Sequence, residues 1–208
     1  MRMLRWLSIA IIFSAISACS KPPEQALPRG TRVLALGDSL TAGNGVLPAE
    51  AWPSLLAANT GWEIINGGVS GDTSAGGLAR LPDLLDEHSP TLVFVSLGGN
   101  DMLRRVPQAD TVANLNRILD LVQAKGAKAV LLATPKPSIT GAVFSSFSAA
   151  EFYRPIADAH KIPLIENALP EVLSDTKLKV DALHPNVAGH LLLTKKITAA
   201  LKEIGYVR

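Results

Sequence analysis

The chain has 208 residues, of which 48% are hydrophobic and 18% are charged, and its formal net charge is +2. This length and composition fit one globular domain with a sizeable core, and they exclude a disordered or low-complexity chain. The small net charge, with no clustered basic face, gives no electrostatic basis for nucleic-acid binding, so no nucleic-acid partner is expected.

The first 18 residues have the anatomy of a secretory signal peptide. Arg2 and Arg5 precede an apolar run that is too short for a comfortable transmembrane span. The segment Ile16-Ser17-Ala18-Cys19 resembles a bacterial lipobox, cleaved before Cys19, which then carries lipid. The alternative is an ordinary signal peptide that ends near a cysteine. We expect a tether over residues 19–30 and a single folded domain over residues 31–208.

Removal of the signal peptide and lipidation of Cys19 would change the net charge, the thiol content and the location of the mature protein. Loss of Arg2 and Arg5 leaves equal numbers of basic and acidic residues, and lipidation of Cys19 leaves no thiol for a disulfide or a metal. The expected location is the bacterial cell envelope, beyond the inner membrane, with the membrane contacted through lipidated Cys19. Ser20 after the cysteine resembles the pattern of lipoproteins that are sorted to the outer membrane of Gram-negative bacteria. The protein would then lie on the periplasmic side of that membrane.

After Thr31, short apolar runs alternate with helical patterns. Unbroken runs such as Leu92–Val95 are typical of strands buried on both faces of a parallel sheet. The predicted strands span Arg32–Leu36, Trp62–Asn66, Thr91–Leu97, Lys128–Thr134 and Ile162–Ile165.

Four stretches between or after these strands carry apolar residues at helical spacing. They are Ala49–Asn59, Ser74–His88, Ala109–Lys125 and about Asn186–Glu203, with Pro82 predicted to kink or break the second. Alternation of strands and helices predicts an α/β domain, a three-layer αβα sandwich around a parallel sheet.

Three polar or glycine-containing segments follow the first three predicted strands. Ser39 lies in Gly37-Asp38-Ser39-Leu40, Gly71 follows the second strand, and Asn100 lies in Gly98-Gly99-Asn100-Asp101. The carboxyl ends of parallel strands form one ligand-binding edge, so these residues are expected to meet. Each segment alone is equally typical of an ordinary turn or helix cap.

A fourth segment, Asp181-Ala182-Leu183-His184, adds a base and a carboxylate. Asp181 lies three residues before His184, so one helical turn could bring the carboxylate beside the imidazole ring. A carboxylate in that place fixes the imidazole tautomer and stabilises the imidazolium. The alternative is a surface Asp–His pair near the start of the last helix.

Together, and in this order, the four segments resemble the GDSL, or SGNH, hydrolase family. That resemblance implies a flavodoxin-like sheet of five parallel strands. It implies that Ser39 attacks an ester carbonyl, that His184 takes the serine proton, and that Asp181 holds His184. It further implies an oxyanion hole built from the Ser39 N–H, the Gly71 N–H and the Asn100 side-chain amide. No metal and no organic cofactor are implied.

The resemblance is closest to the bacterial branch of acyl-thioesterase, protease I and lysophospholipase, with the related arylesterases. Val69–Ser74, Gly77–Pro82 and Asp181–Asn186 carry it. It implies a serine esterase for acyl esters or thioesters, including lysophospholipids or aryl esters. Its partner would be a small acyl-ester or lysolipid substrate, and we expect a monomer.

The segment Pro135–Phe144 departs from the loop that this branch carries after its fourth strand. The stretch that it begins is apolar through Ile139, Val143, Phe144 and Phe147, and we expect this stretch to line or cover an acyl pocket. Ile139, Val143 and Phe144 are the candidate substrate-binding residues. Packing of the same residues on the core is an equal alternative. Two further functions stay open: removal of acetyl groups from glycans, and an inert lipid-anchored envelope protein that only binds.

Overall fold

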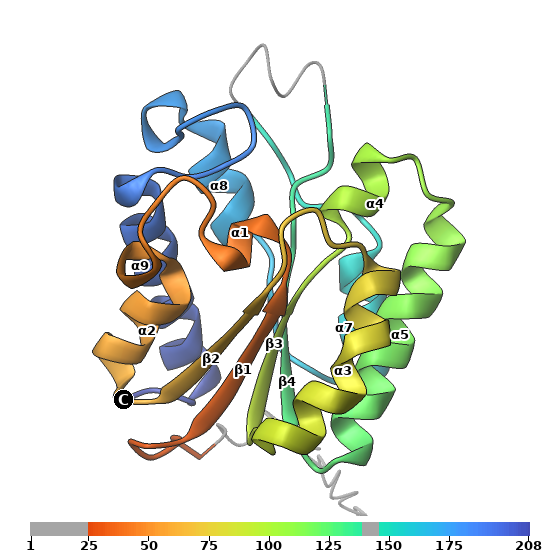
Figure 1. Cartoon of the computed structure of the whole chain (residues 1–208), viewed down its shortest axis with the longest axis vertical. Coiled ribbons are helices and arrows are strands. Elements are labelled where there is room, and N and C mark those ends of the chain that lie inside the picture. Colours follow the sequence, from red (N-terminus) through yellow and green to blue (C-terminus); the bar gives the residue numbers. More distant parts are fainter. Residues whose placement is uncertain (1–24, 139–145) are drawn as a thin grey trace, which may run out of the picture.

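The computed structural model describes residues 25–138 and 146–208 of the chain. Five parallel strands form one sheet in the order β2-β1-β3-β4-β5. The strands are β1 Arg32–Gly37, β2 Glu63–Gly68, β3 Leu92–Ser96, β4 Lys128–Leu132 and β5 Leu164–Ile165. Helices cover both faces, so the predicted three-layer α/β architecture is confirmed (Figure 1).

The sheet is hydrophobic on both faces because its central strands are apolar at every position except their ends. Leu34 and Leu36 of β1 point into one core, and Val33 and Ala35 point into the other. The first core is completed by α3, α5 and α7, and the second by α2, α8 and α9. A strand buried on both sides has no room for alternating polar residues, which explains the unbroken apolar runs.

The helices differ in length from one turn to five. The longer ones are α2 Trp52–Thr60, α3 Ser74–His88, α5 Gln108–Ala124, α7 Tyr153–His160, α8 Ala168–Ser174 and α9 Val187–Ile204. The shorter ones are α1 Ser39–Ala42, α4 Gly99–Leu103 and the 3-10 turns η1 Pro48–Glu50 and η2 Thr176–Leu178. None of the helices in the described ranges is long and apolar enough to cross a membrane.

The predicted elements agree with these bounds to within a few residues, with one correction. Of the two outcomes predicted at Pro82, the break is wrong, because Pro82 lies inside α3, which runs as one helix from Ser74 to His88. The helix survives because Leu81 and Leu85 on either side of Pro82 are buried against the sheet, which offsets the lost backbone hydrogen bond. The stretch 49–59 divides into η1 and α2 at Ala51.

The topology brings the loops of three strands to one edge. Strand β1 lies between β2 and β3, so the segments after these three strands are neighbours at their carboxyl ends (Figure 1). The strand order changes direction at β1, because β2 was added on one side of it and β3 on the other, although all the strands stay parallel. Open parallel sheets bind ligands at such a switch point. The segment before α9 reaches the same edge.

Candidate active site

Ser39 lies at the start of the one-turn helix α1, directly after β1. Asp38 caps this helix, and its Oδ1 accepts the Leu40 N–H at 3.0 Å. The preceding Gly37 makes the abrupt turn possible, because a Cβ there would lie 2.1 Å from Thr41 Oγ1. The local sequence therefore places the Ser39 hydroxyl at the carboxyl edge of the sheet, half-buried.

The loop before α9 brings His184 onto Ser39. His184 Nε2 lies 3.0 Å from Ser39 Oγ, although 145 residues separate them. On the other side of the ring, His184 Nδ1 lies 2.8 Å and 3.0 Å from the two carboxylate oxygens of Asp181. A carboxylate can only accept, so Nδ1 carries the proton and Nε2 is left to accept from the serine hydroxyl. Hydroxyl, imidazole and carboxylate thus form one hydrogen-bonded chain.

A tight local turn fixes the carboxylate. Asp181 Oδ1 also accepts the backbone N–H groups of Leu183 and His184, at 2.7 and 2.8 Å. The hydrogen bond from His184, followed by the one from the Leu183 N–H, lowers the pKa of Asp181 to about 2. The side chain of Asp181 is 54% exposed, so this anchoring relies on local geometry rather than on burial.

The backbone N–H groups of Ser39 and Gly71 have no acceptor among the described residues. Ser39 is the first residue of α1, where no preceding turn of helix can accept its N–H, and Gly71 lies in the turn after β2. Gly71 has a φ of +76°, a left-handed conformation that glycine adopts without strain. Unsatisfied donors are costly unless water or a ligand reaches them, so both are available to a reacting oxygen.

The third predicted donor, the Asn100 amide, is already engaged. Its Nδ2 lies 3.0 Å from the Asp72 carbonyl oxygen and 3.2 Å from Asp38 Oδ2. An amide nitrogen has only two hydrogens, so an oxyanion must share or replace one of these acceptors. The longer bond, to Asp38, is the weaker of the two. Burial raises the pKa of Asp38 to about 6, against the lowering effect of the Leu40 N–H.

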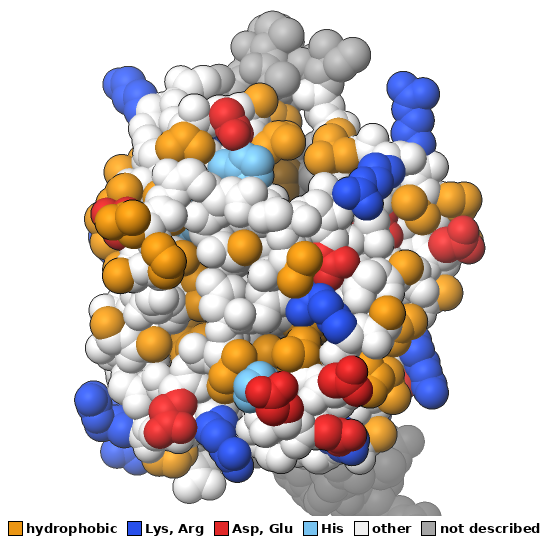
Figure 2. Space-filling model, in the orientation of Figure 1, with side chains coloured by type: hydrophobic (Ala, Val, Ile, Leu, Met, Phe, Trp, Pro, Cys, Tyr) orange, Lys and Arg blue, Asp and Glu red, His pale blue; other side chains and the backbone are white. Residues whose placement is uncertain are grey.

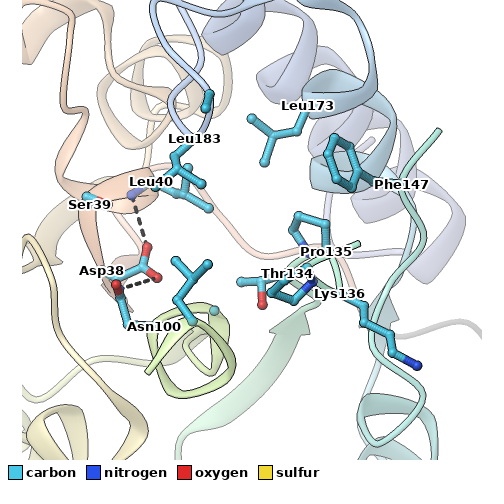
Figure 3. A pocket seen from close by; sticks show the side chains of 14 residues that line it. Asp38, Ser39, Leu40, Asn100, Thr134, Pro135, Lys136, Phe147, Leu173 and Leu183 are labelled. Carbon is cyan, nitrogen blue, oxygen red and sulfur yellow. Dashed lines mark hydrogen bonds between the residues drawn. The ribbon is translucent and has the colours of Figure 1, made fainter. Parts of the chain in front are cut away.

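An apolar pocket of about 110 Å³ opens beside Ser39 (Figure 3). Leu173 of α8, Phe147 and Leu183 form one side of it, and the segment after β4 adds Pro135 and Thr134, with Thr134 lying between Pro135 and Asn100. Asn100 and Asp38 form the polar end next to the serine. A site with one polar end and apolar walls suits an ester with a hydrocarbon group.

The edge around this pocket is unusually apolar at the surface. The large hydrophobic side chains that are exposed in the described ranges belong to connecting segments, to the end of the short helix α4 or to the first turns of α9: Leu47, Val69, Leu103, Val180, Leu183, Val187 and Leu191. Figure 2 shows hydrophobic side chains beside a histidine at this end, with lysine or arginine side chains projecting on either side. The same ranges contain no cluster of three or more His, Cys, Asp or Glu able to hold a metal ion.

The residues predicted for the site from the sequence are only part of those that form it in the structure. The structure brings Ser39, His184 and Asp181 into contact and places Asn100 on the same pocket as Ser39. The candidates Ile139, Val143, Phe144 and Cys19 lie outside the described residues. Phe147, at the end of the apolar stretch predicted to line an acyl pocket, does line it, whereas Leu173 was not predicted as a site residue. Leu173 lies on α8, a short helix whose sequence carries no signal that would place it at the catalytic edge.

Comparison with known proteins gives consistent matches. The sequence profile of the GDSL-like Lipase/Acylhydrolase family matches residues 35–192. An arylesterase of Vibrio mimicus is 36% identical over 189 residues, 88% of this chain and 90% of that protein. Thioesterase 1/protease 1/lysophospholipase L1 of Escherichia coli K12 is 40% identical over 160 residues, 74% of this chain and 75% of that protein. The crystal structure of TesA aligns with a TM-score of 0.74 and 35% identity, covering 84% of this chain and 99% of that one.

Proposed function

This chain belongs to the GDSL-like lipase/acylhydrolase family, and we propose that Ser39 is the nucleophile with which it hydrolyses acyl esters. The chain is an ester-hydrolysing serine esterase, in line with relatives named arylesterase, thioesterase and esterase TesA. The observation that carries the residue assignment is the hydrogen-bonded chain from Ser39 Oγ through His184 to Asp181. Neither glycan deacetylation nor an inert binding role is favoured by these relatives.

The proposed reaction follows from the protonation state of His184. Nε2 takes the hydroxyl proton as Ser39 Oγ attacks the ester carbonyl, and Asp181 stabilises the resulting imidazolium. The carbonyl oxygen gains negative charge and is bound by the Ser39 N–H, the Gly71 N–H and Asn100 Nδ2. The imidazolium protonates the leaving alkoxide, and the alcohol departs. Water, activated by His184, then attacks the acyl-serine, and the acid leaves as Ser39 regains its proton.

We propose that the substrates carry short or medium acyl chains. The apolar pocket beside Ser39 is small, about 110 Å³, and the buried Leu173 and the half-buried Phe147 are part of its wall. Thioesters and lysophospholipids come within the proposal because the E. coli relative is named for both activities. A monomer acting on free small esters agrees with a site formed by one chain.

Hydrolysis of p-nitrophenyl esters from two to sixteen carbons tests this proposal. We expect turnover that is lost in Ser39→Ala, with a maximum at short or medium chains. Leu173→Phe narrows the proposed acyl pocket, so the maximum should move to shorter chains. No turnover of any ester by folded wild-type protein would overturn the nucleophile assignment, and an unchanged profile in Leu173→Phe would overturn the pocket assignment.

We also propose that the mature protein is anchored to the envelope through lipid on Cys19. The lipobox-like segment supports the anchor. The first described residues precede β1 at the edge opposite Ser39, since Leu27 N–H bonds the Tyr206 carbonyl and Gly30 N–H bonds the Gly61 carbonyl. An anchor there leaves the catalytic edge facing away from the membrane that holds it. Incorporation of labelled palmitate into wild-type protein, but not into Cys19→Ala, is the expected result; equal labelling would contradict it.

A further inference from the structure

The proposed oxyanion hole draws two of its donors from separate segments. Gly71 lies in the turn between β2 and α3, and Asn100 lies in α4 after β3. No covalent constraint fixes the distance between these segments, yet the donors must converge on one oxygen within a few tenths of an ångström to act together. Something in the fold must therefore hold the α4 turn against the start of α3.

Asp101, the residue after Asn100, makes that connection. Its side chain is buried, with only 1% of the residue exposed. Oδ2 accepts the backbone N–H of Ser74 at 2.8 Å, and Oδ1 accepts the Ser74 hydroxyl at 2.5 Å. Thr111 of α5 donates a longer bond, 3.3 Å, to the same Oδ1. A single carboxylate thus ties α4 to the first residue of α3 through two short bonds.

Ser74 is in turn close to the other donor along the chain. It lies three residues after Gly71 and begins α3, whose N-cap is Thr73. Asn114 donates to the Ser74 hydroxyl at 3.1 Å, which orients that hydroxyl toward Asp101. Since Ser74 is bonded through both its N–H and its hydroxyl, the segment from Gly71 to Ser74 cannot shift without breaking a buried, charge-assisted hydrogen bond.

Two further bonds join the same pair of segments. Asn100 Nδ2 donates to the Asp72 carbonyl at 3.0 Å, and Arg104 Nη2 donates to the Gly71 carbonyl at 2.7 Å. Arg104 is exposed, so its bond is weaker support than the buried carboxylate. The α4 turn and the Gly71 turn are therefore one bonded unit, and its buried connection is the contact between Asp101 and Ser74.

We propose that Asp101 is a positioning residue for the oxyanion hole, setting the Asn100 amide and the Gly71 N–H at a fixed separation through Ser74. Asp101 does not touch the substrate, since its side chain is buried below the surface of the site and does not line the pocket. The inference rests on the proposed function, because it assigns Gly71 and Asn100 the donor roles given above. Asp101 acts through the geometry of other groups, so its effect belongs in the transition state rather than in substrate binding.

A carboxylate suits this position better than an amide of the same shape. It accepts from the Ser74 N–H, the Ser74 hydroxyl and the Thr111 hydroxyl without contributing a hydrogen of its own. Asn in this place would aim an N–H₂ group at one of these donors, and Asn114 already donates to Ser74. The substitution Asp101→Asn therefore keeps the volume and disturbs the connection between the two turns.

The test compares Asp101→Asn with Thr111→Val. Thr111→Val removes one bond to the same oxygen, but from α5, which carries no oxyanion donor. The readouts are kcat and KM for p-nitrophenyl butyrate, the inhibition constant of a trifluoromethyl ketone that forms a tetrahedral adduct, and Tm. We expect Asp101→Asn to lower kcat about 10- to 100-fold, less than loss of a whole donor, with KM within about twofold. The ketone should bind more weakly by a similar factor, and Thr111→Val should change only Tm.

A double-mutant cycle separates positioning from general destabilisation. In an Asn100→Ala background, Asp101→Asn should cost far less than it does alone, because the amide that it positions is gone. If Asp101→Asn fails to fold, Ser74→Ala takes its place, keeping the carboxylate and the N–H bond while losing the hydroxyl; it should lower kcat about threefold to tenfold.

Two results would overturn the proposal. One is a kcat for the folded variant within twofold of wild type, and the other is a loss of the same size in the Asn100→Ala background. Failure of the proposed function looks different, because then the wild-type protein itself would not turn over the ester and Ser39→Ala would change nothing.

Discussion

The two halves of the site are built in opposite ways. The half that moves protons, Asp181 and His184, is a four-residue turn held by bonds within itself, and its carboxylate is 54% exposed. The half proposed to bind the oxyanion draws on three loops joined by the buried carboxylates of Asp38 and Asp101. The Asp–His turn is thus a local motif at the surface, whereas the oxyanion donors are held by side chains that are buried in the core.

This difference separates chemistry from stability. A change in the exposed turn removes a proton acceptor but leaves few buried groups unsatisfied. A change in the buried half removes an oxyanion donor. It also leaves buried groups without a hydrogen-bond partner, and each such group typically costs about 1–3 kcal/mol of stability. We therefore expect substitutions of Asp181 or His184 to lower activity with little effect on stability. Substitutions in the half proposed to bind the oxyanion should lower both activity and stability.

The largest effect should come from His184→Ala. It removes the base that contacts Ser39 Oγ, so kcat should fall by a factor on the order of 10⁵. The free energy of unfolding should change by no more than about 1 kcal/mol, because the partners that His184 leaves, the Ser39 hydroxyl and the exposed Asp181 carboxylate, can bond water instead. Ester hydrolysis and urea denaturation of the same preparation measure both. A matching loss of stability would mean that the turn is part of the folded core after all.

Asp181→Asn should have the next largest effect. An amide can offer its N–H to His184 Nδ1 and so favour the tautomer whose Nε2 cannot accept the serine proton. We expect kcat to fall by a factor on the order of 10³, less than for a buried carboxylate because solvent partly replaces the lost charge. The activity of Asp181→Glu is the control. Equal activity of Asp181→Asn and wild type would remove Asp181 from the mechanism.

Asn100→Ala should lower kcat by about 10²- to 10³-fold, the usual cost of losing one oxyanion donor. Unlike the two changes above, it should also destabilise the protein by about 1–3 kcal/mol, because the Asp72 carbonyl and Asp38 Oδ2 lose their donor. Thermal unfolding and kcat for p-nitrophenyl butyrate measure the pair of effects. Full activity in a destabilised variant would show that this amide is structural only.

The smallest effect concerns a second histidine, His190 of α9, which is fully buried and unconnected to the chemistry. Its Nδ1 accepts the Trp52 N–H at 3.2 Å, so the ring is neutral, and burial lowers its pKa to about 4. Between pH 4 and 6.5 the unfolded chain binds a proton that the folded protein does not bind, so His190 makes stability rise with pH, by about 3 kcal/mol at most.

Asp38 acts in the opposite direction in nearly the same range. Its pKa is raised to about 6 by burial, so the folded protein holds a proton that the unfolded chain releases, and stability falls as pH rises from about 4 to 6. The two slopes partly cancel. In His190→Asn, which keeps an acceptor for Trp52, stability at pH 5 relative to pH 7 should improve by about 1–2 kcal/mol. Activity at pH 8 should stay as in wild type, in contrast to His184→Ala.

The same division explains what could be predicted from the sequence. The Asp–His pair of the proton-moving half is visible as four consecutive residues, and Ser39, Gly71 and Asn100 follow from their places after three strands. The connections between those loops are not visible, because Asp101 bonds Ser74 across 27 residues and no periodicity marks either of them. The pocket wall formed by Leu173 of α8 could not be predicted either, because the sequence pattern of a seven-residue helix is too short to place one of its residues in the site.

The most direct test of the account is the intact mass of the protein after incubation with a reactive organophosphonate ester at pH 8. The account predicts a single adduct, located on Ser39 by peptide mapping, that is absent from Ser39→Ala and forms far more slowly in His184→Ala. An adduct on another residue, or none while the protein hydrolyses p-nitrophenyl esters, would contradict the assignment of Ser39 as the nucleophile.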